Sequence, residues 1–231
     1  QVRRMDTAST DDPPRKVPEE HPRFCRRRFT LPAIPICATD IGPGKNPTVS
    51  TDADDILARV DDRVGRLTLN RPKALNSLTH TMVTAMDATL AAWADDDDVR
   101  TVVLSGAGER GLCAGGDVVA IYHSAKAGGA DARRFWFDEY RLNSRIGHYP
   151  KPYVALMDGI VMGGGVGVSA HGGIRVVTDT SKIAMPEVGI GFIPDVGGTF
   201  LLSRAPGLLG LHVALTGAPF TGADAIALGF A

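Results

Sequence analysis

Apolar and polar positions alternate with two different periods after residue 51. Residues 63–70 (RVGRLTLN) alternate from one residue to the next, which predicts a half-buried strand. Residues 79–93 instead repeat at helical spacing, so we expect a helix that is capped by Ser77 or Thr79 and packs on a core. The apolar face of this helix consists of Met82, Met86, Leu90 and Trp93.

Further segments continue this alternation of strands and helices. Short apolar runs predict strands over residues 101–105, 153–157 and 174–178, and residues 135–146 predict a helix. A glycine-rich turn and a short helix are expected between the last two of these strands. Repeated strand–helix–strand units predict an α/β fold with parallel strand pairing and right-handed crossovers.

The two ends of the chain differ from its middle. Residues 1–50 hold eight of the 15 prolines and a basic run, and we expect a disordered or mis-extended N-terminal segment. The folded core is expected over residues 51–231. Residues 224–231 predict a helix that stops abruptly, so we expect the C-terminal helical part of the fold to be truncated.

Composition excludes several classes of partner and cofactor. A formal net charge of −1 gives no basis for binding nucleic acid or an anionic membrane. No window reaches the roughly 18–20 apolar residues of a membrane span. Six histidines and three cysteines form no metal-ligand spacing, so no metal site is expected. The unpaired cysteine pattern indicates a reducing compartment, and we expect a cytoplasmic protein.

Three glycine-bearing loops carry the candidate chemistry. They comprise residues 110–117 (RGLCAGGD), 159–173 (GIVMGGGVGVSAHGG) and 186–198 (PEVGIGFIPDVGG). We expect each loop to follow a strand, after the runs 101–105, 153–157 and 174–178 respectively. Because ligands gather at the carboxyl ends of strands in open α/β folds, the three loops are expected to share one pocket.

Glycine clusters expose backbone N–H groups to an anion, and two anions fit this pattern. Residues 165–170 match the dinucleotide fingerprint G-x-G-x-x-G/A, although that motif normally opens a nucleotide domain rather than following two strand–helix passes. Alternatively, Gly116 and Gly164 direct their N–H groups to one point and form a hole for the oxyanion of a reacting carbonyl.

Four motifs together resemble the crotonase (enoyl-CoA hydratase/isomerase) superfamily. They are NRPKALNSL (70–78), GLCAGGD (111–117), GIVMGGGVG (159–167) and MPEVGIGFIPDVGG (185–198), and the resemblance covers about residues 55–231. It implies a spiral of repeated β-β-α units and an acyl-CoA substrate whose coenzyme A is part of the substrate rather than a cofactor. It also implies that Asp117, Val118 and Gly163 contact the substrate, and that the protein is a possible homo-oligomer.

The carboxylates distinguish the reactions of this superfamily. Its hydratases use two glutamates, and one of these corresponds to Glu187 while the position of the other is Gly167. The combination of Glu187, Asp195 and Glu139 without a glutamate at 167 resembles the superfamily's 3-hydroxyisobutyryl-CoA hydrolases. The resemblance therefore implies thioester hydrolysis in valine degradation, with Glu187 as nucleophile or as base for water.

The sequence leaves the roles of the other two carboxylates open. Either residue is a candidate for holding the substrate 3-hydroxyl. Asp195 could instead help water to enter, and Glu139 could tune the pKa values of the neighbouring carboxylates. Alternatively, Asp195 is a helix N-cap, and Glu139 pairs on the surface with Arg134 or Arg141. Two rival functions also stay open: a hydratase or isomerase of the same superfamily, and a non-catalytic acyl-CoA-binding subunit.

Overall fold

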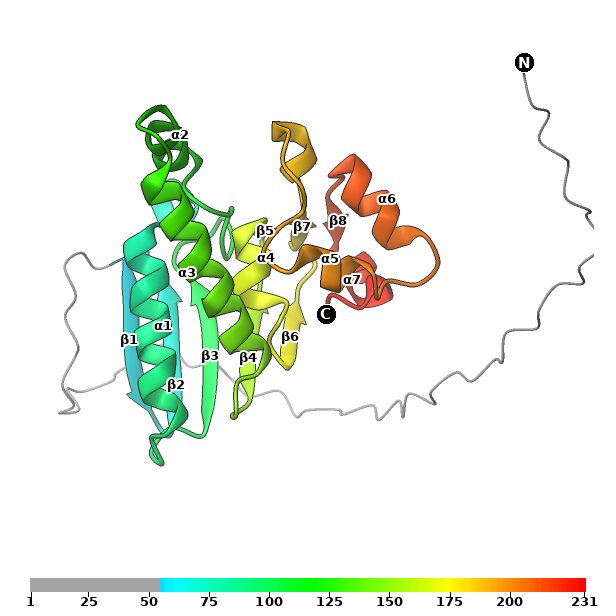
Figure 1. Ribbon diagram of the computed structural model, residues 1–231. Coiled ribbons are helices and arrows are strands. Elements are labelled where there is room, and N and C mark those ends of the chain that lie inside the picture. The colour runs from blue at the N-terminus through cyan, green and yellow to red at the C-terminus, as the bar shows by residue number, and fades with distance from the viewer. Residues whose placement is uncertain (1–54) are drawn as a thin grey trace, which may run out of the picture. The chain divides into compact units, whose positions relative to one another are not determined.

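The computed structural model describes residues 55–231. The expectation of disorder for residues 1–50 lies outside the described residues, and so do Cys25 and Cys37. The described part of the chain forms two sheets with helices packed against them (Figure 1).

The larger sheet has five strands in the order β1-β2-β3-β4-β6. Its strands β2, β3, β4 and β6 run parallel, as the sequence predicted, whereas the edge strand β1 pairs antiparallel with β2. The alternation in β2 places Leu67 and Leu69 in the core and exposes Arg66. The five strands are β1 (Ile56–Asp61), β2 (Val64–Leu69), β3 (Thr101–Gly106), β4 (Tyr153–Met157) and β6 (Ile174–Val177).

Two long helices, α1 (His80–Ala94) and α3 (Ala130–Gly147), cover one face of this sheet (Figure 1). The apolar stripe predicted for α1 is fully within the core, and the Thr79 hydroxyl caps the helix by accepting from the Met82 N–H at 3.2 Å. Gly65 of β2 allows α1 to lie close, since a Cβ there would lie 2.7 Å from the Trp93 ring. Arg145 of α3 donates two hydrogen bonds to the Asp87 carboxylate of α1, at 2.6 and 3.2 Å. These half-buried side chains join the two helices.

The smaller sheet has the strand order β5-β7-β8. Its strands are β5 (Ile160–Met162), β7 (Lys182–Ala184) and β8 (Phe220–Thr221). The other helices are α2 (Val118–Lys126), α4 (Gly164–Ser169), α5 (Gly198–Leu202), α6 (Leu209–Thr216) and α7 (Gly222–Leu228), with short 3-10 turns η1 (Pro72–Ala74) and η2 (Glu187–Ile190).

The smaller sheet corrects the prediction for two loops. The glycine-rich loop 159–173 follows the strand 153–157 as predicted but contains the unpredicted strand β5, and the loop 186–198 follows β7 rather than the run 174–178. Strands β5 and β7 have three residues each, too few for a period to be visible in the sequence. They pair in parallel with Met162 opposite Ala184, so the two loops leave the same edge side by side.

Candidate active site

The loop 110–117 lies against the smaller sheet, and in this way all three glycine-bearing loops come together. Cys113 bridges to Val161 in parallel, and the Met162 N–H donates to the Cys113 carbonyl at 2.9 Å. On the other side, the Leu78 N–H donates to the Gly115 carbonyl at 2.8 Å. These backbone bonds hold Gly115 and Gly116 next to the start of α4.

Two backbone N–H groups meet at this point. The Gly116 nitrogen lies 3.3 Å from the position that a Cβ would occupy on Gly164. Within residues 55–231, neither the Gly116 N–H nor the Gly164 N–H donates to another protein group. Two unpaired donors at one point are the arrangement that an oxyanion hole requires, and both belong to the predicted pair.

Two carboxylates lie directly beside the glycine run. A Cβ on Gly164 would lie 2.5 Å from Oε1 of Glu139, and a Cβ on Gly163 would lie 3.0 Å from Oε1 of Glu187. Glu139 is 2% exposed and Glu187 is 6% exposed. Glu139 Oε1 and Glu187 Oε2 have no hydrogen-bond partner among the described residues. Buried carboxylate oxygens without partners are unusual in structural roles and common where a ligand binds.

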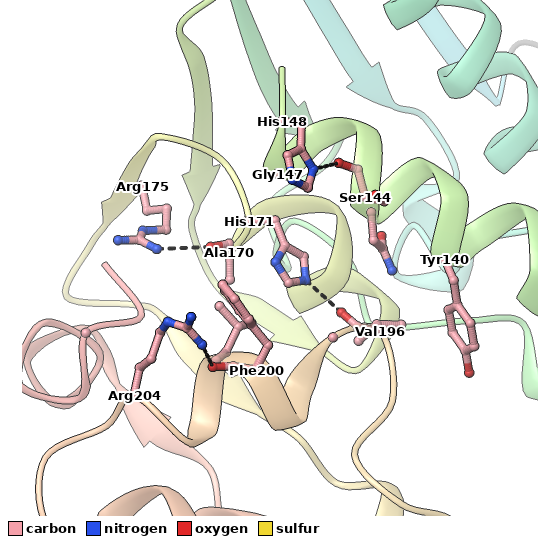
Figure 2. Close-up of a pocket in the computed structure, with 14 residues that line it drawn as sticks. Tyr140, Ser144, Gly147, His148, Ala170, His171, Arg175, Val196, Phe200 and Arg204 are labelled. Carbon is pink, nitrogen blue, oxygen red and sulfur yellow. Dashed lines mark hydrogen bonds between the residues drawn. The ribbon is translucent and has the colours of Figure 1, made fainter. Parts of the chain in front are cut away.

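Asp195, the third carboxylate of the site, lies in the loop that follows η2. Its Oδ2 accepts a hydrogen bond from the Tyr140 hydroxyl at 2.8 Å. Tyr140 follows Glu139 on α3, so one helix supplies both the buried glutamate and the hydroxyl that binds Asp195. In Figure 2 the Tyr140 side chain lies at one end of a cavity that Val196 also lines.

Burial raises the pKa values of all three carboxylates, and the charge of Asp195 adds to the effect on the two glutamates. Burial and then the charges of Asp195 and Glu187 raise the pKa of Glu139 to about 8. Burial, with a smaller contribution from Asp195, raises the pKa of Glu187 to about 7. Burial also raises the pKa of Asp195, against the hydrogen bond from Tyr140, which lowers it. At neutral pH the group therefore holds at least one proton, on Glu139.

The structure decides between the alternatives that the sequence left open for two of these residues. Gly197 caps α5 without a side-chain bond, so Asp195 is not an N-cap. Glu139 faces the interior, and neither Arg134 nor Arg141 pairs with it in the described part of the chain.

The glycines of the dinucleotide-like motif are packing positions. All six residues of α4 are buried, and a Cβ on Gly165 would collide with the Cys113 carbonyl. A Cβ on Gly167 would lie 2.7 Å from Cβ of Val196 and 2.9 Å from Nδ2 of Asn143. No cofactor phosphate can approach these glycines, so the dinucleotide interpretation is wrong.

A cleft of about 570 Å³ opens onto Gly116. Asp117 and Val118 line it, and Val118 is exposed. The Asp117 carboxylate is already engaged, because it accepts from the Ala120 N–H and from Arg71, at 3.2 and 3.3 Å. Any contact of Asp117 with a ligand would therefore involve its backbone or its remaining acceptor capacity.

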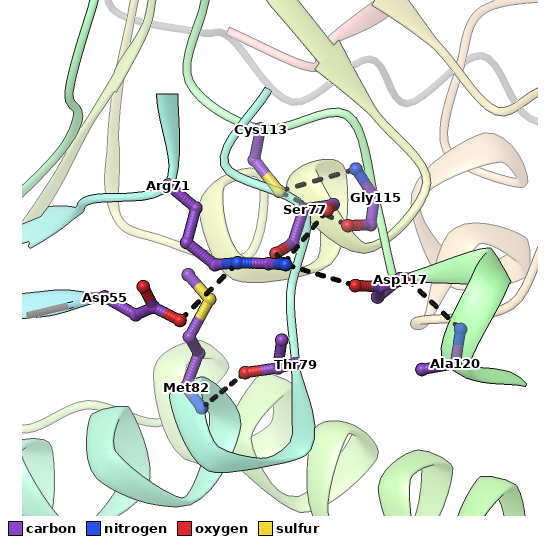
Figure 3. A network of polar contacts seen from close by, with 9 residues as sticks. All are labelled: Asp55, Arg71, Ser77, Thr79, Met82, Cys113, Gly115, Asp117 and Ala120. Carbon is purple, nitrogen blue, oxygen red and sulfur yellow. Dashed lines mark hydrogen bonds and ion pairs between the residues drawn. The ribbon is translucent and has the colours of Figure 1, made fainter. Parts of the chain in front are cut away.

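Arg71 ties the loop 70–78 to this cleft (Figure 3). Its guanidinium donates to the Ser77 carbonyl at 2.6 Å, and forms ion pairs with Asp117 and Asp55 at 3.3 and 3.5 Å. Sequence reasoning missed Arg71 and Tyr140 as supporting residues. Arg71 lies within the motif 70–78 and Tyr140 directly follows the candidate Glu139, and these positions were the available signal.

Other candidate groups have structural surroundings. Burial raises the pKa of the Cys113 thiol to about 12, which makes it a poor nucleophile. Within residues 55–231, no group of three or more His, Cys, Asp or Glu side chains could hold a metal ion. In the same part of the chain, no helix is both long and apolar enough to cross a bilayer.

The chain matches the family model described as enoyl-CoA hydratase/isomerase over residues 64–231. It is 48% identical over 182 residues to "3-hydroxyisobutyryl-CoA hydrolase, mitochondrial" of Danio rerio, covering 79% of this chain and 48% of the relative. The human protein of the same name is 44% identical, with 78% and 46% covered. The chain thus spans about half the length of the curated relatives that it matches.

Solved structures resemble the chain over a similar range. A structure called a carnitinyl-CoA dehydratase, from Mycobacterium thermoresistibile, has a TM-score of 0.77 and 78% identity, covering 78% of this chain and 53% of that one. An enoyl-CoA hydratase from Rhodobacter sphaeroides has a TM-score of 0.76 and 50% identity, covering 77% and 53%. The predicted crotonase-like α/β fold is confirmed by these likenesses and the family match.

Proposed function

The chain belongs to the enoyl-CoA hydratase/isomerase family, and we propose that within it the site hydrolyses an acyl-CoA thioester, with 3-hydroxyisobutyryl-CoA as substrate. One observation carries the proposal. Glu139 and Glu187 lie beside two free backbone N–H groups, Asp195 is close enough for its charge to raise the pKa values of both glutamates, and the position of the second hydratase glutamate is Gly167. The hydrolase names of the relatives from Danio rerio and human support the same choice.

The two N–H groups stabilise the charge that develops during acyl transfer. The thioester carbonyl oxygen accepts from the Gly116 and Gly164 N–H groups, of which Gly116 lines the cleft and Gly164 lies beside Gly116. Each donor of this kind is worth roughly 3–4 kcal/mol in a water-excluded site. Because both donors belong to the backbone, they are held in place before the substrate binds.

Glu187 supplies the reactive carboxylate. Its raised pKa of about 7 lets it act as a base near neutral pH, and its ionised form accumulates as the pH rises through that value. In one route it attacks the acyl carbon and expels CoA as a thiolate, and water then hydrolyses the anhydride. In the other route it takes a proton from water, whose oxygen attacks directly.

The other two carboxylates hold the acyl group. Glu139, with a pKa of about 8, keeps its proton at neutral pH and can donate a hydrogen bond to the substrate 3-hydroxyl. Asp195, held by Tyr140 at 2.8 Å, can accept from the same hydroxyl. A donor and an acceptor together would favour a hydroxylated acyl chain over a plain one.

Dehydration or hydration of an acyl-CoA is the second candidate function. It is favoured by the name of the 78% identical structure and by the proximity of Asp195 to Glu187, which provides two carboxylates for proton transfer. The lack of a side chain at Gly167, and the packing of Val196 into that space, favour hydrolysis instead.

Two assays on the same sample separate these functions. Release of free thiol from 3-hydroxyisobutyryl-CoA measures hydrolysis, and loss of enoyl absorbance from crotonyl-CoA measures hydration. Glu187→Gln should lower thiol release at least about a hundredfold, the scale of losing an acid–base group. Glu109→Gln, which alters an exposed loop glutamate, is the matched control. Near-normal hydrolysis by Glu187→Gln would remove Glu187 from the mechanism.

The cellular compartment and the oligomeric state of the protein stay predictions. The relatives from Danio rerio and human carry the word mitochondrial in their names, whereas the cysteine pattern favours a cytoplasmic protein. Fractionation of cells that express the natural gene would distinguish the two. A homo-oligomer is likewise expected, and light scattering would measure it.

A further inference from the structure

A second cavity, of about 660 Å³, lies beside the carboxylate group, on the side of Tyr140 and Asn143. Its lining shares no residue with the lining of the cleft that opens onto Gly116. Figure 2 shows Tyr140 at one end of this cavity and Arg175 and Arg204 at the other. Tyr140 binds Asp195, so the inner end of the cavity adjoins the site.

The cavity is lined by a buried asparagine whose amide has no protein partner. Asn143 is 5% exposed, and neither its Oδ1 nor its Nδ2 forms a hydrogen bond within the described part of the chain. An unpaired buried amide is costly, and native proteins usually satisfy such groups with water or a ligand. Asn143 lines the cavity, but its two polar atoms are themselves enclosed, so water reaches the amide only when the side chain shifts.

Asn143 also lies next to the reacting groups. It follows Glu139 by one helical turn on the same face of α3, which separates the two Cβ atoms by about 6 Å. Its Nδ2 lies 2.9 Å, and its Oδ1 3.1 Å, from the position of a Cβ on Gly167. Glu139 Oε1 and Glu187 Oε2 are also without partners, so several unfilled hydrogen-bonding positions gather here.

We infer that Asn143 positions the water that hydrolyses the acyl group, and that this cavity supplies that water while acyl-CoA occupies the cleft. The inference rests on the proposed thioester hydrolysis, which consumes one water per turnover. The water oxygen forms a bond to the acyl carbon, and one of its protons passes to a carboxylate. The bond that breaks is either the C–S bond or the acyl–oxygen bond to Glu187.

A neutral amide suits this position. It can accept from the water O–H through Oδ1 and donate to the water oxygen through Nδ2. A fourth carboxylate would add like charge to three groups whose pKa values are already raised. A separate water path also keeps the bulky thioester from blocking the second reactant.

Asn143→Leu tests the inference, because leucine has a similar volume and removes both polar atoms. We expect thermal stability to stay the same or rise, since an unpaired amide is lost. The turnover number should fall about tenfold or more, with KM changed by less than about twofold, because the variant misplaces water rather than substrate. Ser144→Ala is the control. Ser144 lines the same cavity from an exposed position, so this substitution should leave the turnover number and KM unchanged.

The outcomes separate this inference from the function on which it rests. If the unsubstituted chain releases no thiol, the proposed hydrolysis is refuted. If it does and Asn143→Leu hydrolyses at the same rate, only the role of Asn143 is refuted. Should the variant fail to fold, a high-resolution crystal structure of the unsubstituted chain decides. A water within about 3.2 Å of the Asn143 amide supports the inference, and a dry amide overturns it.

Discussion

Neutralising Glu139 should remove a pH-dependent loss of stability. The side chain is 2% exposed, and its Oε1 has no partner among the described residues. Burial, then the charges of Asp195 and Glu187, raise its pKa from 4.5 to about 8. The folded protein thus disfavours the ionised form, while the unfolded chain ionises it at the ordinary value.

The sign and size of the effect follow from proton linkage. Between about pH 4.5 and pH 8 the folded state binds more protons at Glu139 than the unfolded state, so the free energy of unfolding falls as the pH rises. One pKa unit corresponds to about 1.4 kcal/mol. Between about pH 5 and pH 8, this carboxyl alone should therefore lower the free energy of unfolding by about 3 kcal/mol.

Urea denaturation at about pH 5 and pH 8 measures the effect. Glu139→Gln keeps the side-chain shape and lacks the ionisation, so the variant should gain about 3 kcal/mol relative to the unsubstituted protein on going from the lower to the higher pH. Glu109→Gln, on the exposed loop, should follow the unsubstituted protein at both values. If the curves of Glu139→Gln and the unsubstituted protein stay parallel in pH, Glu139 is not a buried carboxyl that resists ionisation.

Three further predictions concern neighbouring positions. Gly167→Glu should cost about 1–3 kcal/mol in urea denaturation through overpacking against Val196, and crotonyl-CoA absorbance should show no gain of hydration. Tyr140→Phe removes the hydrogen bond that lowers the pKa of Asp195, so any acidic limb due to Asp195 in the pH–rate profile should move to higher pH. Peptide mapping after brief native iodoacetamide treatment should find Cys113 unmodified, since burial raises its pKa to about 12, and labelling after denaturation is the control.

Long periodic segments carried enough information for the frame of the fold. The stripe on α1 and the alternation in β2 each span a whole element, and both are found where the sequence predicts them. Strands β5 and β7, with three residues each, are too short to show a period. The sequence therefore located the glycine-bearing segments but missed strand β5 within one of them and strand β7 before another.

The site was only partly accessible to sequence reasoning for a similar reason. Gly116, Gly164 and Glu187 lie in dense motifs, and they meet in the structure. Glu139 lies on an amphipathic helix, and the sequence does not say which of its polar residues faces inward. Asp138, the residue beside Glu139, pairs with His80 at 2.7 Å instead. Asn143 has no sequence signal, because its importance comes from two unpaired atoms and a cavity.

The glycine run does more than expose backbone N–H groups. Each of three glycines leaves room for a polar side chain from elsewhere in the chain: Gly163 for Glu187, Gly164 for Glu139 and Gly167 for Asn143. A methyl group at Gly164 would lie 2.5 Å from the Glu139 carboxylate, so it would have to displace that side chain although the N–H donor remained. In the proposed mechanism Gly164 therefore both supplies an oxyanion donor and, together with Gly163 and Gly167, leaves room for the side chains around the site. Within this family fold, a change at one glycine can thus alter the reaction by admitting or excluding a neighbour, as the side-chain-free position 167 does for Asn143.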